Sequence, residues 1–169
     1  EVNAATARAL IVALGAGALV LMLKAPIVDF ALAMVGASAQ VDTTSREYLD
    51  IRLWSAPAAF ANLALLGVLF GLQRMRDALW VQLVLNLINM LLDLYFVLVL
   101  DWGVPGVAWA TLIAEYAAAA FACVLVWRAL RRVGGDWHEL DLANRVRLRG
   151  LLVVNANIFV RTLYVQLTF

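Results

Sequence analysis

Two reactive residue types are almost absent from this sequence. It contains one cysteine, Cys123, and one histidine, His138, among 169 residues. A single cysteine cannot form a disulfide within the chain, and Cys123 lies in an apolar run typical of a small buried side chain. His138 lies in a polar stretch, and the sequence has no GxSG, HExxH or paired-aspartate pattern. The sequence therefore lacks the residue patterns that serine, zinc and aspartyl catalysis require, and we do not expect an enzyme.

Charge is scarce as well. Charged residues make up 15% of the chain and hydrophobic residues 65%, and the mean hydropathy is +0.89. A soluble domain is about half apolar and about a quarter charged. The composition therefore predicts an integral membrane protein. The net charge of +1 gives no indication of a nucleic-acid partner.

Both ends of the sequence differ from those of a complete membrane protein. The first residues, EVNAATARAL, have no initiator methionine and no signal-peptide layout with a small-residue cleavage site. The last residues, VRTLYVQLTF, stop inside an apolar run. We therefore expect an internal piece of a longer protein.

Apolar runs of membrane-spanning length recur along the chain. Four are predicted to be transmembrane helices, at residues 7–24, 48–72, 78–100 and 105–128. A fifth begins at residues 150–169 and carries Asn155, Asn157 and Arg161, which are too polar to face lipid. The expected fold is an all-α, polytopic helix bundle with about five transmembrane helices.

Proline and glycine predict where these spans bend or pack. Pro26 should end or kink the first span and Pro57 should kink the second, since proline removes a backbone donor. Residues 37–46 are expected to form a polar connection, and Asp50 and Arg52 should lie at the membrane interface. Four glycines on the first two spans are expected to let helices approach closely: Gly15, Gly17, Gly67 and Gly71.

The arginines of the loops predict the orientation. Arg74 and Arg76 lie between the second and third spans, and alternating topology places that loop on the same side as the linker after the fourth span. The turn at residues 101–106 has no positive charge. By the positive-inside rule the arginine-bearing loops are cytoplasmic. The linker arginines are Arg128, Arg131, Arg132, Arg145, Arg147 and Arg149.

A polar stripe runs along the third span, which is otherwise apolar from Trp80 to Leu100. Its spacings of 4, 3 and 4 residues place its members on one side of a helix. A carboxylate in such a run costs about 2.5–3.5 kcal/mol on insertion scales, so it usually faces a cavity or a partner. We interpret the stripe as the wall of an ion or substrate pathway. Its members are Gln82, Asn86, Asn89 and Asp93.

The third and fourth spans should pack as antiparallel neighbours that turn at Trp102. Asp93 and Thr111 are each nine residues from Trp102, and Asn89 and Glu115 are each thirteen, which predicts matching depths within each pair. A carboxylate, an amide carbonyl and a hydroxyl would suit a hard cation, or a proton carried on the carboxylate. The alternative is a set of interhelical hydrogen bonds that only hold a bundle together, each contributing about 0.6 kcal/mol.

Four blocks of the sequence resemble the multidrug and toxic compound extrusion (MATE) family, and most closely its DinF-like bacterial branch. They are REYLDIRLWSAPAAFANLALLGVLFGLQR, LVLNLINMLLDLYFVL, DWGVPGVAWATLIAEY and, more loosely, NANIFVRTLYVQL. The resemblance implies part of a twelve-helix transporter with two six-helix lobes around a central cavity. Residues 1–133 would then belong to the N-terminal lobe as its helices three to six. Residues 134–149 would be the cytoplasmic linker between lobes, and 150–169 the incomplete first helix of the C-terminal lobe.

The resemblance also implies a site and an activity. Asn89, Asp93 and Thr111 match the family's cation or proton site, whose remaining aspartate belongs to a first helix that this chain does not contain. The family implies efflux of organic cations or amphiphiles against H⁺ or Na⁺ by alternating access, in the bacterial inner membrane. No cofactor beyond the coupling ion is implied, and the partners are lipid, the substrate and the remaining helices. The further candidates for lining the cavity are Gln82, Asn86, Glu115, Asn62, Asn155, Asn157 and Arg161.

Two other functions remain open. A lipid-linked precursor flippase of the same superfamily usually has several arginines in its cavity, and only Arg161 and Arg52 are candidates here. A small structural membrane subunit would need to be complete at this length, which the chain ends and the odd number of spans disfavour.

Overall fold

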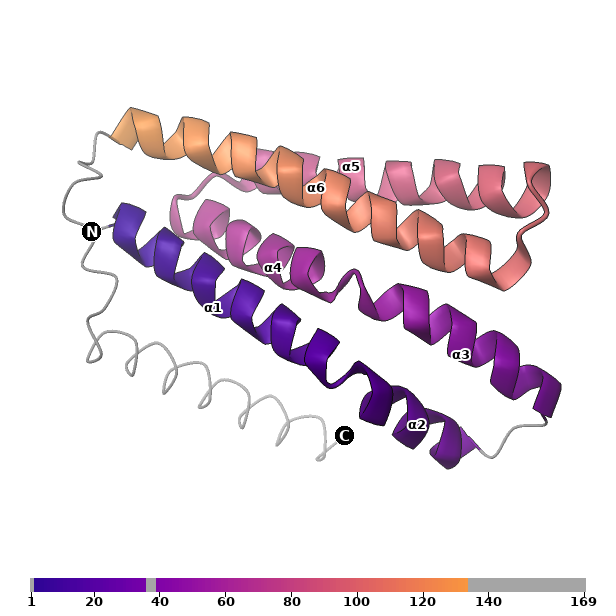
Figure 1. The fold of residues 1–169 in the computed structure, drawn as a ribbon. Helices are drawn as coiled ribbons and strands as arrows, with labels where there is room; N and C mark the ends of the chain where they lie inside the picture. Colours follow the sequence, from indigo (N-terminus) through magenta and orange to yellow (C-terminus); the bar gives the residue numbers. More distant parts are fainter. Residues whose placement is uncertain (1, 36–38, 134–169) are drawn as a thin grey trace, which may run out of the picture.

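The computed structural model describes residues 2–35 and 39–133, and the regular elements there are all helices joined by short turns (Figure 1). The predicted linker and fifth span, with Asn155, Asn157 and Arg161, lie outside the described residues. The polytopic helical fold predicted from composition is confirmed. The helices are α1 (Val2–Met22), α2 (Lys24–Val35), α3 (Ala39–Leu53), α4 (Ala56–Gly71), α5 (Met75–Leu94), the π-helical η1 (Tyr95–Val99) and α6 (Gly103–Val133).

Three stretches of the described chain are long and apolar enough to cross a membrane: α1, α5 together with η1, and α6. A fourth span results if α3 and α4 are taken together, since they meet at a bend of 46°. Pro57 is in the first turn of α4, where its missing N–H is not needed, and it cannot continue a hydrogen-bond ladder from α3. The predicted kink at Pro57 is confirmed. The orientation derived from the loop arginines stays a prediction.

A second break lies between α1 and α2. Leu23 separates the two helices, and Pro26 again falls in the first turn of the helix that follows. Because α1 packs on α4 and α2 packs on α3, the two breaks occur in paired helices (Figure 1). The connection expected at residues 37–46 is wrong from Ala39 onward, where α3 begins. A polar composition without proline or glycine does not stop a helix.

The bundle is organised around α6, which contacts α3, α4 and α5. Every fourth residue along one side of α6 is a fully buried alanine, and such small side chains let helix backbones approach closely. These alanines are Ala110, Ala114, Ala118 and Ala122. At the end of the bundle that holds the α4–α5 loop, α6 closes a small apolar core with those two helices, which includes Leu65, Leu69, Ala78, Val81 and Val126.

Only one of the four glycines predicted to pack closely does so among the described residues. A Cβ atom on Gly17 would lie 2.5 Å from the Cα atom of Pro57, so α1 and α4 touch backbone to backbone there. A Cβ on Gly15, Gly67 or Gly71 would meet nothing within 4 Å. The close approach of α1 therefore centres on the first turn of α4, next to the break.

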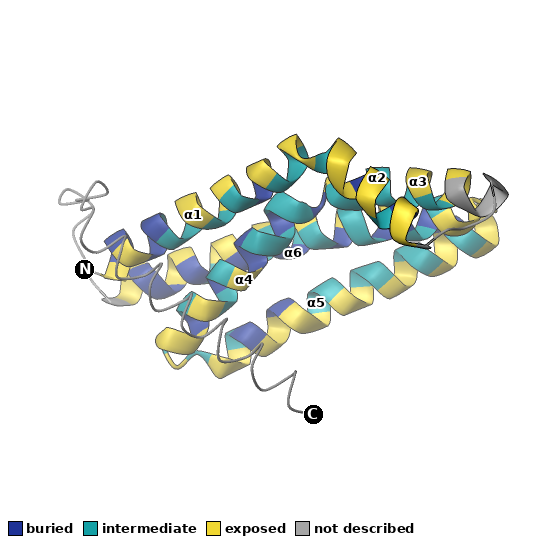
Figure 2. Ribbon diagram, turned by 90° about the horizontal axis from the view of Figure 1, so that it is seen from below, coloured by how far each residue is buried: buried dark blue, intermediate teal, exposed yellow. Residues whose placement is uncertain are grey.

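The outward surface of α5 is exposed along its length (Figure 2), and most of the exposed side chains are apolar. Leu83, Leu87 and Leu91 are each about half exposed. A surface of this kind suits contact with lipid tails or with further helices rather than with water. This surface therefore agrees with a position in the membrane.

Candidate functional site

The turn between α5 and α6 sets which residues of the two helices face each other. Tyr95–Val99 is a π-helical turn, which holds more residues per turn than an α-helix. The Trp102 N–H donates to the Phe96 carbonyl at 3.0 Å, and the two rings stack with their centroids 5.0 Å apart. Gly106 sits beneath them, since a Cβ there would lie 3.1 Å from the Cβ atoms of both aromatic residues.

This turn shifts the pairing from the one predicted by counting residues. Asn89 Nδ2 donates to Thr111 Oγ1 at 3.2 Å, although Asn89 is thirteen residues from Trp102 and Thr111 is nine. The predicted match of Asn89 with Glu115 is wrong by about one helical turn. The reason is that the π-helical turn and the non-helical Leu100–Trp102 segment use extra residues on the α5 side.

The donor and the acceptor of the Asn89–Thr111 hydrogen bond can both be assigned. The Thr111 hydroxyl donates to the Val107 carbonyl one turn back at 2.9 Å, so its lone pair is free to accept from Asn89. Asn89 donates one N–H of its amide nitrogen to this bond, and its carbonyl oxygen remains available as an acceptor or a ligand. The contact joins α5 to α6 in the predicted site.

Asp93 lies one turn beyond Asn89 on the same side of α5, and it is half-buried. Its Oδ1 atom is buried and has no hydrogen-bond partner among the described residues. Buried carboxylate oxygens are almost always paired, so an unpaired one requires an explanation such as an ion or a proton. Carboxylate, amide and hydroxyl oxygens are the groups that a hard cation prefers. The donor set fits the predicted ligand.

Glu115 lies one turn from Thr111 along α6 and is bound from α4. Asn62 Nδ2 donates to the Glu115 carboxylate at 2.7 Å and to the Glu115 backbone carbonyl at 3.0 Å. Because a backbone carbonyl only accepts, the nitrogen of the Asn62 amide must point toward Glu115. The Asn62 Oδ1 atom then points away, and it is buried without a partner among the described residues.

The structure therefore brings together five of the predicted site residues and separates two others. The five form a polar track from α5 across α6 to α4, and the remaining two members of the polar stripe, Gln82 and Asn86, are exposed. The hydrogen-bonded members of the track connect three helices that are distant in sequence. Its residues are Asp93, Asn89, Thr111, Glu115 and Asn62.

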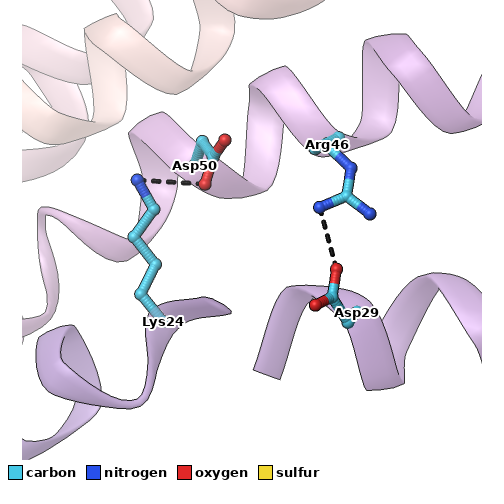
Figure 3. A network of polar contacts seen from close by, with 4 residues as sticks. All are labelled: Lys24, Asp29, Arg46 and Asp50. Atoms are coloured by element: carbon cyan, nitrogen blue, oxygen red, sulfur yellow. Dashed lines mark ion pairs between the residues drawn. The ribbon is translucent and has the colours of Figure 1, made fainter. Parts of the chain in front are cut away.

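Two ion pairs that the sequence analysis did not predict tie α2 to α3 (Figure 3). Lys24 Nζ lies 3.0 Å from Asp50 Oδ1, and Arg46 Nη1 lies 2.9 Å from Asp29 Oδ1. Asp50 thus pairs with α2, while Arg52 donates to the Ser55 hydroxyl at the α3–α4 break. The charge of each residue was visible in the sequence, but the pairing depends on how the two broken helices align.

Three buried polar residues near the start of α1 were also not predicted from the sequence. Asn3, Thr6 and Arg8 are each 5% exposed, and the Thr6 hydroxyl donates to the Val2 carbonyl at 3.0 Å. The predicted first span began at residue 7, so two of these residues were placed before the membrane. Their spacings of three and two residues do not place all three on one helix face, so helical periodicity did not indicate their burial.

A threonine-to-valine substitution tests whether the Asn89–Thr111 bond joins the two helices. Thr111→Val keeps the shape but removes the hydroxyl, so we expect a loss of about 0.6 kcal/mol in unfolding free energy, up to about 1.7. Thr111→Ser keeps the hydroxyl and should retain most of the stability. Unfolding in mixed micelles measures both. A loss of stability in Thr111→Ser with none in Thr111→Val would show that the methyl group, and not the hydrogen bond, matters here.

Comparison with known proteins gives one family. The MatE family model matches residues 1–95. The chain is 43% identical over 160 residues to DNA damage-inducible protein F of Escherichia coli (strain K12), which is 95% of this chain and 35% of that protein. It is 28% identical over 116 residues to Protein DETOXIFICATION 43 of Arabidopsis thaliana, covering 69% of this chain and 22% of that protein.

A further plant relative matches a shorter part. Protein DETOXIFICATION 42 of Arabidopsis thaliana is 32% identical over 89 residues, which is 53% of this chain and 17% of the relative. No solved structure gives a significant match. The chain thus spans about a third, or less, of the length of the curated relatives it matches.

Proposed function

This chain belongs to the MATE family, and we propose that it acts within a transporter of its relatives' length that exports organic cations or amphiphiles in exchange for H⁺ or Na⁺. The chain is a multi-pass membrane segment, and its similarity to an Escherichia coli protein supports a place in the bacterial inner membrane. The role proposed for it is transport and not catalysis.

One observation carries the proposal. The Asp93 carboxylate has a buried oxygen without a partner among the described residues, and it lies within an apolar membrane span. An ionisable side chain in that position is expensive, and it usually marks an ion pathway or a proton relay. A proton or a sodium ion bound there would offset the cost by neutralising the charge.

The neighbouring residues give Asp93 a way to change the lobe's conformation. Asn89 and Thr111 join α5 to α6 one turn away, and Glu115 and Asn62 join α6 to α4. When Asp93 carries its ion, the carboxylate at the α5 end of this track is neutralised, and when the ion leaves, a charged carboxylate must be accommodated there. An ion can shift the equilibrium between the two conformations of the transporter only if it binds one of them more tightly than the other. A change of one buried charge provides such a difference.

Gradient-driven efflux tests this proposal directly. We expect Asp93→Asn in the full-length transporter to abolish efflux of an organic cation from inverted vesicles, because the amide cannot take up a proton and removes the charge that holds Na⁺. The H⁺ and Na⁺ gradients are imposed separately, so that the active one identifies the ion. Asp101→Asn is the matched control, since Asp101 is exposed in the α5–α6 turn.

The contradicting result is equally clear. If Asp93→Asn inserts and folds normally and its efflux equals that of Asp101→Asn and the wild type under both gradients, Asp93 is a structural residue. The coupling site would then lie elsewhere.

A further inference from the structure

Positive charge collects at the end of the bundle that holds the α4–α5 loop. Ala78 and Val81 of α5 share one apolar core with Val126 and Leu130 of α6, so the start of α5 and the end of α6 lie together. These two segments carry five arginines and one acidic residue. We call the surface that they form the basic end, and its residues are Arg74, Arg76, Arg128, Arg131, Arg132 and Asp77.

One arginine of the basic end is neutralised by a neighbour. Arg74 Nε lies 2.5 Å from Asp77 Oδ2, whereas no ion pair joins the other four arginines to a carboxylate in the described part of the chain. All four are exposed. The arginines of α6 favour the negative end of its helix dipole, but Arg76 lies in the first turn of α5, where the dipole disfavours a cation. Helix stabilisation therefore does not account for Arg76.

The Arg131 side chain is held in place by a ring one turn back along α6. Its guanidinium carbon lies 3.8 Å from the centre of the Trp127 ring, over the ring face. A guanidinium in this position keeps the N–H donors at its edge, and that planar fork can bind a phosphate through two hydrogen bonds at once. The fork is therefore positioned before any anion binds.

Apolar surface adjoins the arginines. Met75, Leu79 and Trp80, in the first turns of α5, are each more than half exposed, and Trp127 is 46% exposed. Tryptophans near the ends of membrane spans lie at the depth of the lipid headgroups. A molecule with an anionic head and an apolar body matches this combination better than a soluble anion does.

The α4–α5 loop adds a hollow of about 440 Å³ to the basic end. Its lining supplies the guanidinium groups of Arg74 and Arg76 together with the apolar side chain of Met75. Because Arg74 is paired with Asp77, Arg76 is the arginine of this hollow that is left to attract an anion.

We propose that the basic end binds the headgroup of an anionic phospholipid, with the Arg131 guanidinium on the phosphate and with Arg76 and Arg128 adding positive potential. Basic surfaces at the cytoplasmic ends of transmembrane helices attract such headgroups, and the loop arginines predict that this end is cytoplasmic. The basic end contains no residue of the polar track. The binding is therefore separate from ion coupling and from the exported substrate.

Lipid titration of the full-length transporter in detergent tests the proposal, with bound lipid counted by native mass spectrometry. The probes are phosphatidylglycerol, which is anionic, and phosphatidylcholine with the same acyl chains, which is zwitterionic. We expect the wild type to bind phosphatidylglycerol about tenfold more tightly. Arg131→Gln should remove most of that difference, because it loses both the charge and the fork. Its affinity for phosphatidylcholine should not change.

Two variants show whether the position and the shape of Arg131 matter. Arg46→Gln also removes one exposed arginine, but from α3 and outside the basic end, so its phosphatidylglycerol affinity should equal that of the wild type. Arg131→Lys keeps the charge without the planar fork and should bind phosphatidylglycerol about threefold more weakly than the wild type. Since Arg131 is exposed, neither of its substitutions disturbs the apolar core.

Free glycerol phosphate distinguishes a lipid from a soluble phosphate. It carries the phosphate without acyl chains, so it should not displace phosphatidylglycerol at equal concentration. Displacement would overturn the lipid assignment. The proposal is also overturned if Arg131→Gln binds phosphatidylglycerol as tightly as Arg46→Gln does, or if Arg131→Lys equals the wild type, since charge alone would then be sufficient.

Discussion

Gly17→Ala is expected to lower the unfolding free energy by about 1–3 kcal/mol, because the added methyl group would push α1 away from α4. Its Cβ would lie 2.5 Å from Pro57 Cα, 2.8 Å from Pro57 N and 3.2 Å from the carbonyl carbon of Ala56. All three are backbone atoms, so no side chain can rotate away to make room. The helices must separate, and the tight contact that supports the break before α4 is lost.

Gly15→Ala is the matched control on the same helix. A Cβ there meets nothing within 4 Å, and alanine favours a helix over glycine by about 1 kcal/mol, so its stability should be unchanged or slightly increased. Unfolding in mixed micelles compares the two variants. If Gly17→Ala is as stable as Gly15→Ala, α1 does not pack on Pro57 as described.

Asn62→Leu is expected to lower the unfolding free energy by about 2 kcal/mol. Asn62 is 4% exposed and donates to both the side chain and the backbone carbonyl of Glu115. Leucine is of similar volume but offers no donor, so the carboxylate and the carbonyl both lose a partner inside the bundle. Bonds to charged groups are the stronger ones, which places this effect above the membrane average for one hydrogen bond.

A double-mutant cycle separates the lost bond from a simple packing change. In a Glu115→Gln background the side chain is neutral, so Asn62→Leu should cost about half as much as in the wild type. The unfolding free energies of the four proteins give the coupling between the two residues. A cost of Asn62→Leu that is the same in both backgrounds would show that Asn62 acts through packing alone.

The sequence was sufficient to predict the helical membrane fold and the break at Pro57 in the second predicted span. Long apolar runs require helices, because a backbone in lipid must satisfy its own hydrogen bonds. Pro57 required a break, because it lacks a donor. Both conclusions depend only on local chemistry, and both agree with the structure.

The partners of the polar residues could not be predicted in the same way. Counting from Trp102 assumes an α-helix up to the turn, but Tyr95–Val99 is π-helical and moves Asn89 level with Thr111. Nothing in the apolar run YFVLV indicates that change. Glu115 then pairs with Asn62, which is fifty-three residues away, through the packing of α4 on α6.

The packing partners of the glycines could not be predicted from the sequence either. Four glycines on two spans have equal capacity for close packing, yet only Gly17 lies against another backbone in the described chain. The small side chain gives the capacity for close contact, and the packing of α1 on the first turn of α4 decides that Gly17 is the glycine in contact. Likewise, Lys24 and Asp50 meet because both breaks occur at the same level of the bundle.

Ion binding to the purified full-length protein is the most direct measurement of the central claim, that Asp93 holds the coupling ion. Calorimetric titration with Na⁺, together with proton uptake and release in weak buffer, measures both candidate ions without transport. The wild type is predicted to bind one of them, and Asp93→Asn is predicted to lose that binding while Asp101→Asn keeps it. If Asp93→Asn binds both ions as the wild type does, the coupling ion is not held by Asp93.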